Sequence, residues 1–130
     1  MKKFFMLAIA TVATLVFLGC GVAQVYNVNG NAINANKQAT LEDVQKAITR
    51  AGGGLGWIMK KVSENEMQGT LMLRKHVAVV SIKHTTQDYS INYVSSTNLD
   101  YSPTENTIHS NYNGWIQNLN KAIQVQLGLL

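Results

Sequence analysis

The fold is decided by the stretch from Trp57 to Val94, WIMKKVSENEMQGTLMLRKHVAVVSIKHTTQDYSINYV. Four runs in it are rich in β-branched and aromatic residues and predict strands: residues 57–62, 68–74, 77–84 and 89–94. Residues 63–66 and 85–88 between them are polar and typical of turns. This spacing predicts an antiparallel meander, in which Lys75-His76 is either a turn or a bulge within one bent strand.

Amphipathic helices are expected on both sides of this stretch. Thr40 is a good N-cap with Asp43 three residues later, and an apolar face recurs until Gly52-Gly53-Gly54 ends the helix. A last helix is expected from about Thr107 to Leu127. Its apolar stripe comprises Ile108, Tyr112, Trp115, Ile116, Leu119, Ile123 and Leu127. We therefore expect an α+β domain of order α-β-β-β-β-α, with both helices on one face of an antiparallel sheet of about four strands.

The first 20 residues predict export. Lys2 and Lys3 form a positive region, and residues 4–19 follow without a charge. This run is shorter than the about 20 apolar residues of a stable membrane span. Its end, Val16-Phe17-Leu18-Gly19-Cys20, resembles the lipobox of bacterial lipoprotein precursors. The resemblance implies that residues 1–19 are a signal peptide and that Cys20 carries acyl chains such as palmitate, which hold the protein to a membrane.

Two alternatives to lipid attachment are open. Gly21-Val22-Ala23 is a small-x-small sequence, so ordinary cleavage after Ala23 would release a soluble periplasmic protein. An uncleaved segment would instead be a membrane anchor. Gly21, rather than the aspartate that retains such lipoproteins in the inner membrane, implies lipid attachment to the periplasmic face of the outer membrane.

Composition limits what the rest of the chain can be. Removing 19 residues from 130 leaves 111, enough for one domain. Nine basic residues then remain against seven acidic ones, a net charge of +2, which argues against a nucleic-acid partner. The single cysteine excludes an internal disulfide framework. We expect a lipidated tether over residues 20–39, in which Val25–Val28 is a candidate edge strand, and a folded domain over residues 40–130.

The residues that could carry catalysis or bind a metal are few. The three histidines, His76, His84 and His109, lack the spacing of a zinc site, so no metal and no cofactor is expected. His109 with a polar loop from Ser95 to Asn106 would serve an unrecognised small envelope enzyme. No Gly-x-Ser-x-Gly motif supports that alternative, and we expect no enzyme.

Two further features are candidate surfaces. Residues 89–115 are the stretch densest in aromatic and asparagine side chains, a combination that suits either recognition or packing of the last helix on the sheet. Lys60-Lys61 and Arg74-Lys75-His76 are small basic clusters on neighbouring candidate strands, close enough across a hairpin to form one patch for anionic lipid headgroups, or else solvated sheet residues.

The order of motifs from Leu41 to Ile123 resembles small lipoproteins of Gram-negative bacteria. The resemblance is carried by Leu-Glu-Asp-Val from Leu41, Arg-Lys-His-x-Ala-Val-Val-x-Ile from Arg74, Tyr-Ser-Ile-x-Tyr-x-x-Ser-x-Asn-Leu from Tyr89 and Ile-His-x-x-Tyr-Asn-x-Trp-Ile from Ile108. It implies an envelope location and no particular activity. From the expected anchor and a small domain without catalytic motifs, we expect a binding or structural role, with an envelope protein or a cell-wall component as partner. The residues that match the polar-aromatic signature of these lipoproteins are the candidate ligand surface: Ser96, Asn98, His109, Tyr112, Asn113 and Trp115.

Overall fold

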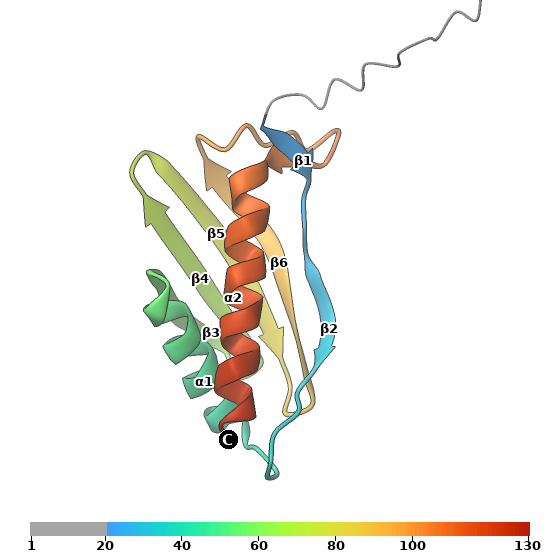
Figure 1. Cartoon of the computed structure of the whole chain (residues 1–130), viewed down its shortest axis with the longest axis vertical. Coiled ribbons are helices and arrows are strands. Elements are labelled where there is room, and N and C mark those ends of the chain that lie inside the picture. The colour runs from blue at the N-terminus through green and yellow to red at the C-terminus, as the bar shows by residue number, and fades with distance from the viewer. Residues whose placement is uncertain (1–20) are drawn as a thin grey trace, which may run out of the picture.

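The computed structural model describes residues 21–130, which form an α+β domain (Figure 1). The predicted meander is present as four strands: β3 (Trp57–Ser63), β4 (Glu66–Leu73), β5 (His76–His84) and β6 (Asp88–Thr97). Each pairs antiparallel with the next. Leu73 pairs with His76, so Arg74 and Lys75 are a two-residue turn and the alternative of one bent strand is wrong.

The order and number of strands differ from the prediction. Within the described chain the main sheet has five strands in the order β2-β6-β5-β4-β3, because β2 (Val28–Ala32) precedes the first helix and pairs with β6. A separate pair is formed by β1 (Val22–Gln24) and β7 (Thr107–His109). These added strands are short or rich in asparagine and glycine, so no alternation of apolar residues reveals them. Long-range pairing makes them strands.

Residues 21–39 therefore pack on the domain instead of forming the expected tether. The N–H of Val25 donates to the carbonyl of Asn106 at 2.9 Å, and Val28 is only 6% exposed. The candidate strand at Val25–Val28 begins only at its last residue. The pairing of β2 with β6 shifts register between Val28 and Asn31, where Gly30 has a φ of +57°. This outer strand is consequently bent.

The helices begin where side chains cap them. α1 (Leu41–Gly54) has the predicted capping box, with hydrogen bonds of 3.1 Å in both directions between Thr40 and Asp43. The bond from the Thr40 N–H lowers the pKa of the Asp43 carboxyl. α1 continues through Gly54, so the predicted stop at the three glycines comes too early. Gly52 packs closely on β3, where a Cβ would lie 2.3 Å from Met59 Cε. α2 (Ser110–Gly128) starts after β7, later than predicted. No helix in residues 21–130 is long and apolar enough to span a bilayer.

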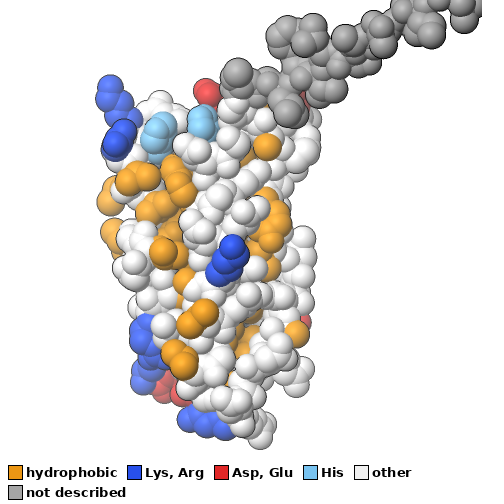
Figure 2. Space-filling model, in the orientation of Figure 1, with side chains coloured by type: hydrophobic (Ala, Val, Ile, Leu, Met, Phe, Trp, Pro, Cys, Tyr) orange, Lys and Arg blue, Asp and Glu red, His pale blue; other side chains and the backbone are white. Residues whose placement is uncertain are grey.

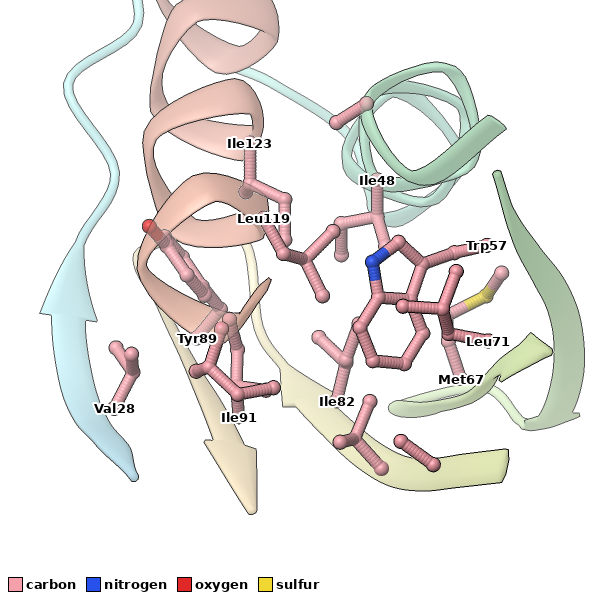
Figure 3. Packing of buried hydrophobic residues seen from close by; sticks show 14 of the residues in the cluster. Val28, Ile48, Trp57, Met67, Leu71, Ile82, Tyr89, Ile91, Leu119 and Ile123 are labelled. Atoms are coloured by element: carbon pink, nitrogen blue, oxygen red, sulfur yellow. The ribbon is translucent and has the colours of Figure 1, made fainter. Parts of the chain in front are cut away.

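Both helices cover one face of the main sheet, as predicted (Figures 1 and 3). The apolar stripe of α2 is buried at Tyr112, Ile116, Leu119, Ile123 and Leu127, and that of α1 at Val44, Ala47, Ile48 and Ala51. The sheet contributes side chains from alternate positions: Trp57, Met67, Leu71, Ala78, Val80, Ile82, Tyr89 and Ile91. The core thus lies between one helical layer and one sheet layer.

The opposite face of the sheet carries no helix. The alternate residues of the strands point there, and Ile58, Val62, Met72 and Val94 are between 52% and 61% exposed. Residues nearer the β3–β4 turn are polar, among them Glu66, Gln68 and Lys83. β3, the other outer strand of the sheet, exposes Lys60 on this face, whereas Lys61 pairs with Met67 and lies on the side of α1. We call this surface the uncovered face.

The packing of α2 can be tested by a pair of truncations on one helix. Leu119→Ala should lower the free energy of unfolding by about 2–5 kcal/mol, because it opens a cavity in the core. Val125→Ala removes an exposed side chain on the same helix and should change the free energy of unfolding by less than about 0.5 kcal/mol. Urea denaturation measures both. Equal losses would contradict this placement of the core.

Candidate functional site

The end of the domain at which the described chain begins contains most of the candidate residues. We call it the N-terminal end. It consists of the β1–β7 pair, the β4–β5 turn, residues 98–106 and the first turns of α2. In Figure 1 these elements lie together at the top of the long axis, and the C-terminus lies near the bottom.

Gly21 is fixed at this end by the start of α2. The N–H of Ser110 donates to the Gly21 carbonyl at 2.6 Å, and β1 follows at once, pairing Val22 with His109. Gly21 has a φ of +98°, which glycine adopts without strain, and a Cβ there would lie 3.5 Å from His109 Nε2. Cys20, the expected lipid site, lies outside the described residues. The residue bonded to it is part of the fold.

Two of the candidate residues hold this N-terminal segment. His109 caps α2, since its Nδ1 accepts from the N–H of Asn111 at 3.1 Å. Asn113 Oδ1 accepts from the N–H of Tyr26 at 2.9 Å, and its Nδ2 donates to the carbonyl of Gln24 at 2.7 Å. Both side chains are thus engaged within the domain.

Tyr112 and Ser96 belong to a packed tyrosine cluster. Tyr112 is fully buried, its hydroxyl has no hydrogen-bond partner among residues 21–130, and burial raises its pKa. Its ring meets that of Tyr93 edge-on, with 5.7 Å between centroids, and Tyr93 stacks on Tyr101 at 4.2 Å. The Tyr93 hydroxyl is 2.8 Å from Ser96 Oγ. These contacts fit the packing alternative better than the recognition alternative.

Asn98 and Trp115 lie beside the β4–β5 turn, Asn98 exposed and Trp115 half-buried. His76 Nδ1 donates to the Asn98 carbonyl at 2.7 Å, and Asn98 Nδ2 donates to the Lys75 carbonyl at 2.8 Å. The ring centroids of His76 and Trp115 are 6.3 Å apart. The turn is therefore fastened to the segment after β6 and lies close to the first turns of α2.

The tip of this turn is basic and exposed. Arg74 and Lys75 are exposed, and so are Met72 and Leu73 just before them. Figure 2 shows Lys and Arg side chains at this upper corner, with hydrophobic side chains below them. Arg74 has a φ of +55°, a conformation for which tight hairpins prefer glycine or asparagine. The sequence shows the charges but not this backbone geometry.

The other basic cluster lies elsewhere. Lys60 pairs with Gln68 in the β3–β4 register, about six residues along β4 from Arg74, or about 20 Å. Lys61 Nζ forms an ion pair with Glu64 Oε1 at 3.0 Å beside the β3–β4 turn. The hairpin thus separates the two clusters and does not join them into one patch.

The sequence does not predict a pocket that lies at the opposite end of the sheet. It has a volume of about 330 Å³, and its lining includes Ser63, Glu66, Lys83, His84, Asp88 and Ser90. Ser81 Oγ donates to Glu66 Oε1 at 2.8 Å, and Thr85 Oγ1 donates to Asp88 Oδ1 at 3.0 Å. Both carboxylates are thus hydrogen-bonded by neighbours. Glu66 was read as part of a turn, although Glu66, Gln68 and Thr70 alternate with apolar residues.

The three histidines do not converge. His76 and His84 lie at opposite ends of β5, about 26 Å apart along the strand. His84 is 2% exposed, and burial lowers its pKa. Its Nε2 has no hydrogen-bond partner in the described part of the chain. Residues 21–130 hold no group of three or more His, Cys, Asp or Glu side chains that is arranged to bind a metal.

Comparison with family models, with curated proteins and with solved structures finds no match for this chain. The inference of function therefore rests on the residues and on their geometry.

The role of Asn113 predicts a local loss of order. Asn113→Ala removes both hydrogen bonds to residues 24–26 and should speed amide hydrogen exchange in β1, with a loss of about 1–2 kcal/mol in unfolding free energy. Asn118→Ala, at an exposed position of the same helix, is the matched control and should leave exchange in β1 unchanged. The same exchange rates in both variants would contradict this role.

The burial of His84 predicts a pH-dependent stability. Its pKa in the folded state lies below the ordinary 6.5, so below that pH the unfolded chain binds the proton more readily. The free energy of unfolding should fall between pH 7 and pH 5 by up to about 1.4 kcal/mol per pH unit. His84→Gln should flatten that slope, and His76→Gln on the same strand should keep it. Denaturation at several pH values measures the slopes, and parallel slopes for wild type and His84→Gln would refute the prediction.

Proposed function

We propose that this chain is a small lipid-anchored binding or structural protein of the bacterial cell envelope. Cys20 carries the lipid, and the domain faces the periplasm from the outer membrane. The observation that carries the proposal is that Gly21, the residue directly after the lipobox-like cysteine, is hydrogen-bonded into the domain.

The hydrogen bonding of Gly21 bears on whether the chain is cleaved before Cys20 or after Ala23. Cleavage before Cys20 leaves β1 complete. Cleavage after Ala23 would remove Gly21, Val22 and Ala23, and with them the hydrogen bond from Ser110 and two of the three residues of β1. A protein processed there would lose part of its own structure. The geometry therefore favours lipid attachment over release as a soluble protein.

A short connection between lipid and fold has a mechanical consequence. Cys20 is joined to Gly21 by one peptide bond, which places its Cα about 3.8 Å from that of Gly21. Several acyl chains would give stable anchoring in a bilayer. The N-terminal end of the domain would then contact the membrane. The uncovered face would be roughly perpendicular to the bilayer plane and open to the periplasm on one side.

The uncovered face supports a binding or structural role. It combines exposed apolar side chains on β3, β4 and β6 with polar rows nearer the β3–β4 turn, a mixture that suits an envelope protein or a cell-wall component. The enzymatic alternative has no comparable support. Its histidine, His109, caps α2, and the Leu99 carbonyl in its loop accepts from the His109 N–H at 2.7 Å.

Metabolic labelling with an alkyne palmitate tests the anchor. The full chain should incorporate label and fractionate with the outer membrane, and Cys20→Ala should lose both properties. Mass spectrometry of the mature N-terminus supplies the independent readout, with an acylated Cys20 as the expected first residue. An unlabelled protein that begins at Gln24 would refute the proposal.

A further inference from the structure

We propose that the β4–β5 turn docks on anionic phospholipid headgroups of the bilayer that holds the Cys20 lipid. This inference rests on the proposed lipid anchor. It adds a second contact with the membrane, made by the folded domain itself through Arg74 and Lys75.

The first reason is position. The β4–β5 turn and β1, which directly follows Gly21, lie at the same end of the long axis (Figure 1). Because Gly21 is hydrogen-bonded to Ser110 and continues into β1, an anchor on the preceding residue brings this whole end toward the bilayer. The anchor would keep the turn close to the membrane surface, and this proximity raises the effective concentration of the turn at the headgroups.

The second reason is the chemistry of the tip. Arg74 and Lys75 place two positive charges at the tip of the β4–β5 hairpin. Met72 and Leu73 expose apolar surface beside them. Half-buried Trp115 lies next to His76, the first residue after the turn. Cationic, apolar and aromatic side chains together are the composition of surfaces that settle at the boundary between headgroups and acyl chains.

The third reason is the backbone. Arg74 adopts a φ of +55°, which costs free energy for any residue with a Cβ, and glycine would avoid that cost. The chain nevertheless presents an arginine there. The turn is also held in place, because Asn98 Nδ2 donates to the Lys75 carbonyl and His76 donates to the Asn98 carbonyl. Both cations therefore project from a turn that hydrogen bonds hold in place.

The acidic residues of the N-terminal end limit the contact to one side. Asp100 and Glu105 lie in the segment between β6 and β7, and Arg74 and Lys75 lie in the β4–β5 turn. The two positive and two negative charges of these side chains cancel over the N-terminal end as a whole. The attraction is local to the turn, and we expect added salt to weaken it.

The test uses the lipid-bearing full chain in vesicles. Cys20 is the only cysteine in the sequence and is consumed by acylation, so Leu73→Cys provides a single thiol for a fluorescent probe. Lipids with nitroxide headgroups quench a probe that touches the surface. We expect strong quenching in vesicles of phosphatidylcholine mixed with phosphatidylglycerol, and weak quenching in phosphatidylcholine alone. A probe on Gln87→Cys, in the β5–β6 turn at the other end, should stay unquenched in both.

Charge variants make the test specific. Arg74→Gly with Lys75→Gln removes both cations and relieves the strained φ, so the hairpin should fold at least as well as in the wild type. Docking on the anionic vesicles should weaken by about 5-fold per charge, or about 30-fold for the pair. Lys60→Gln with Lys121→Gln removes two exposed charges elsewhere and should leave the quenching at position 73 unchanged.

The outcomes distinguish this proposal from the anchor on which it rests. A chain that floats with vesicles but shows equal quenching at position 73 in neutral and anionic lipid would overturn the headgroup contact and leave the anchor standing. Equal loss of quenching in both double variants would also overturn it, since the effect would then follow net charge. A chain without lipid that fails to float would overturn both.

Discussion

The structure depends on burial of one face of α2 against the five-stranded sheet. Ile116, Leu119, Ile123 and Leu127 are buried in the core. Figure 3 shows Leu119 and Ile123 of α2 over the strands, with α1 beside them. Because α2 runs the length of the sheet, its first turn lies at the N-terminal end, where Ser110 and Asn113 bind residues 21–26. Burial of its apolar face therefore fixes the position of α2, and hydrogen bonds from the first turn of α2 fix residues 21–26. The same packing leaves the other sheet face uncovered.

The sequence was informative wherever a periodic apolar pattern met a buried surface. The runs of β-branched and aromatic residues between polar turns in residues 57–94 predicted the meander, and the stripe of α2 predicted its buried face. β1, β2 and β7 were missed because three to five residues of mixed polarity have no period to detect. Their partners are long-range, as in the pairing of Val22 with His109, and only the folded chain brings those partners together.

The candidate site shows the same division. The candidate residues from the sequence gather at one end of the molecule, since Asn98, His109, Asn113 and Trp115 all lie at the N-terminal end. It did not separate side chains that present a surface from those that hold the fold, because an asparagine that binds a backbone segment looks like any other asparagine. It also read Arg74 and Lys75 as ordinary sheet residues or half of a larger patch. Their isolation at a tight turn follows from the strand register.

The bend in β2 would matter for copies that the proposed lipid anchor holds close together on one membrane. An outer strand presents unpaired N–H and C=O groups, to which a neighbouring molecule can add a strand of its own. Confinement to a surface raises the frequency of such encounters. The register shift between Val28 and Asn31 disrupts a straight edge on one side of the sheet, and Lys60 with Lys61 places positive charge along β3 on the other. Both features oppose edge-to-edge growth into β-aggregates, so a dense layer of these domains can remain a layer of separate molecules.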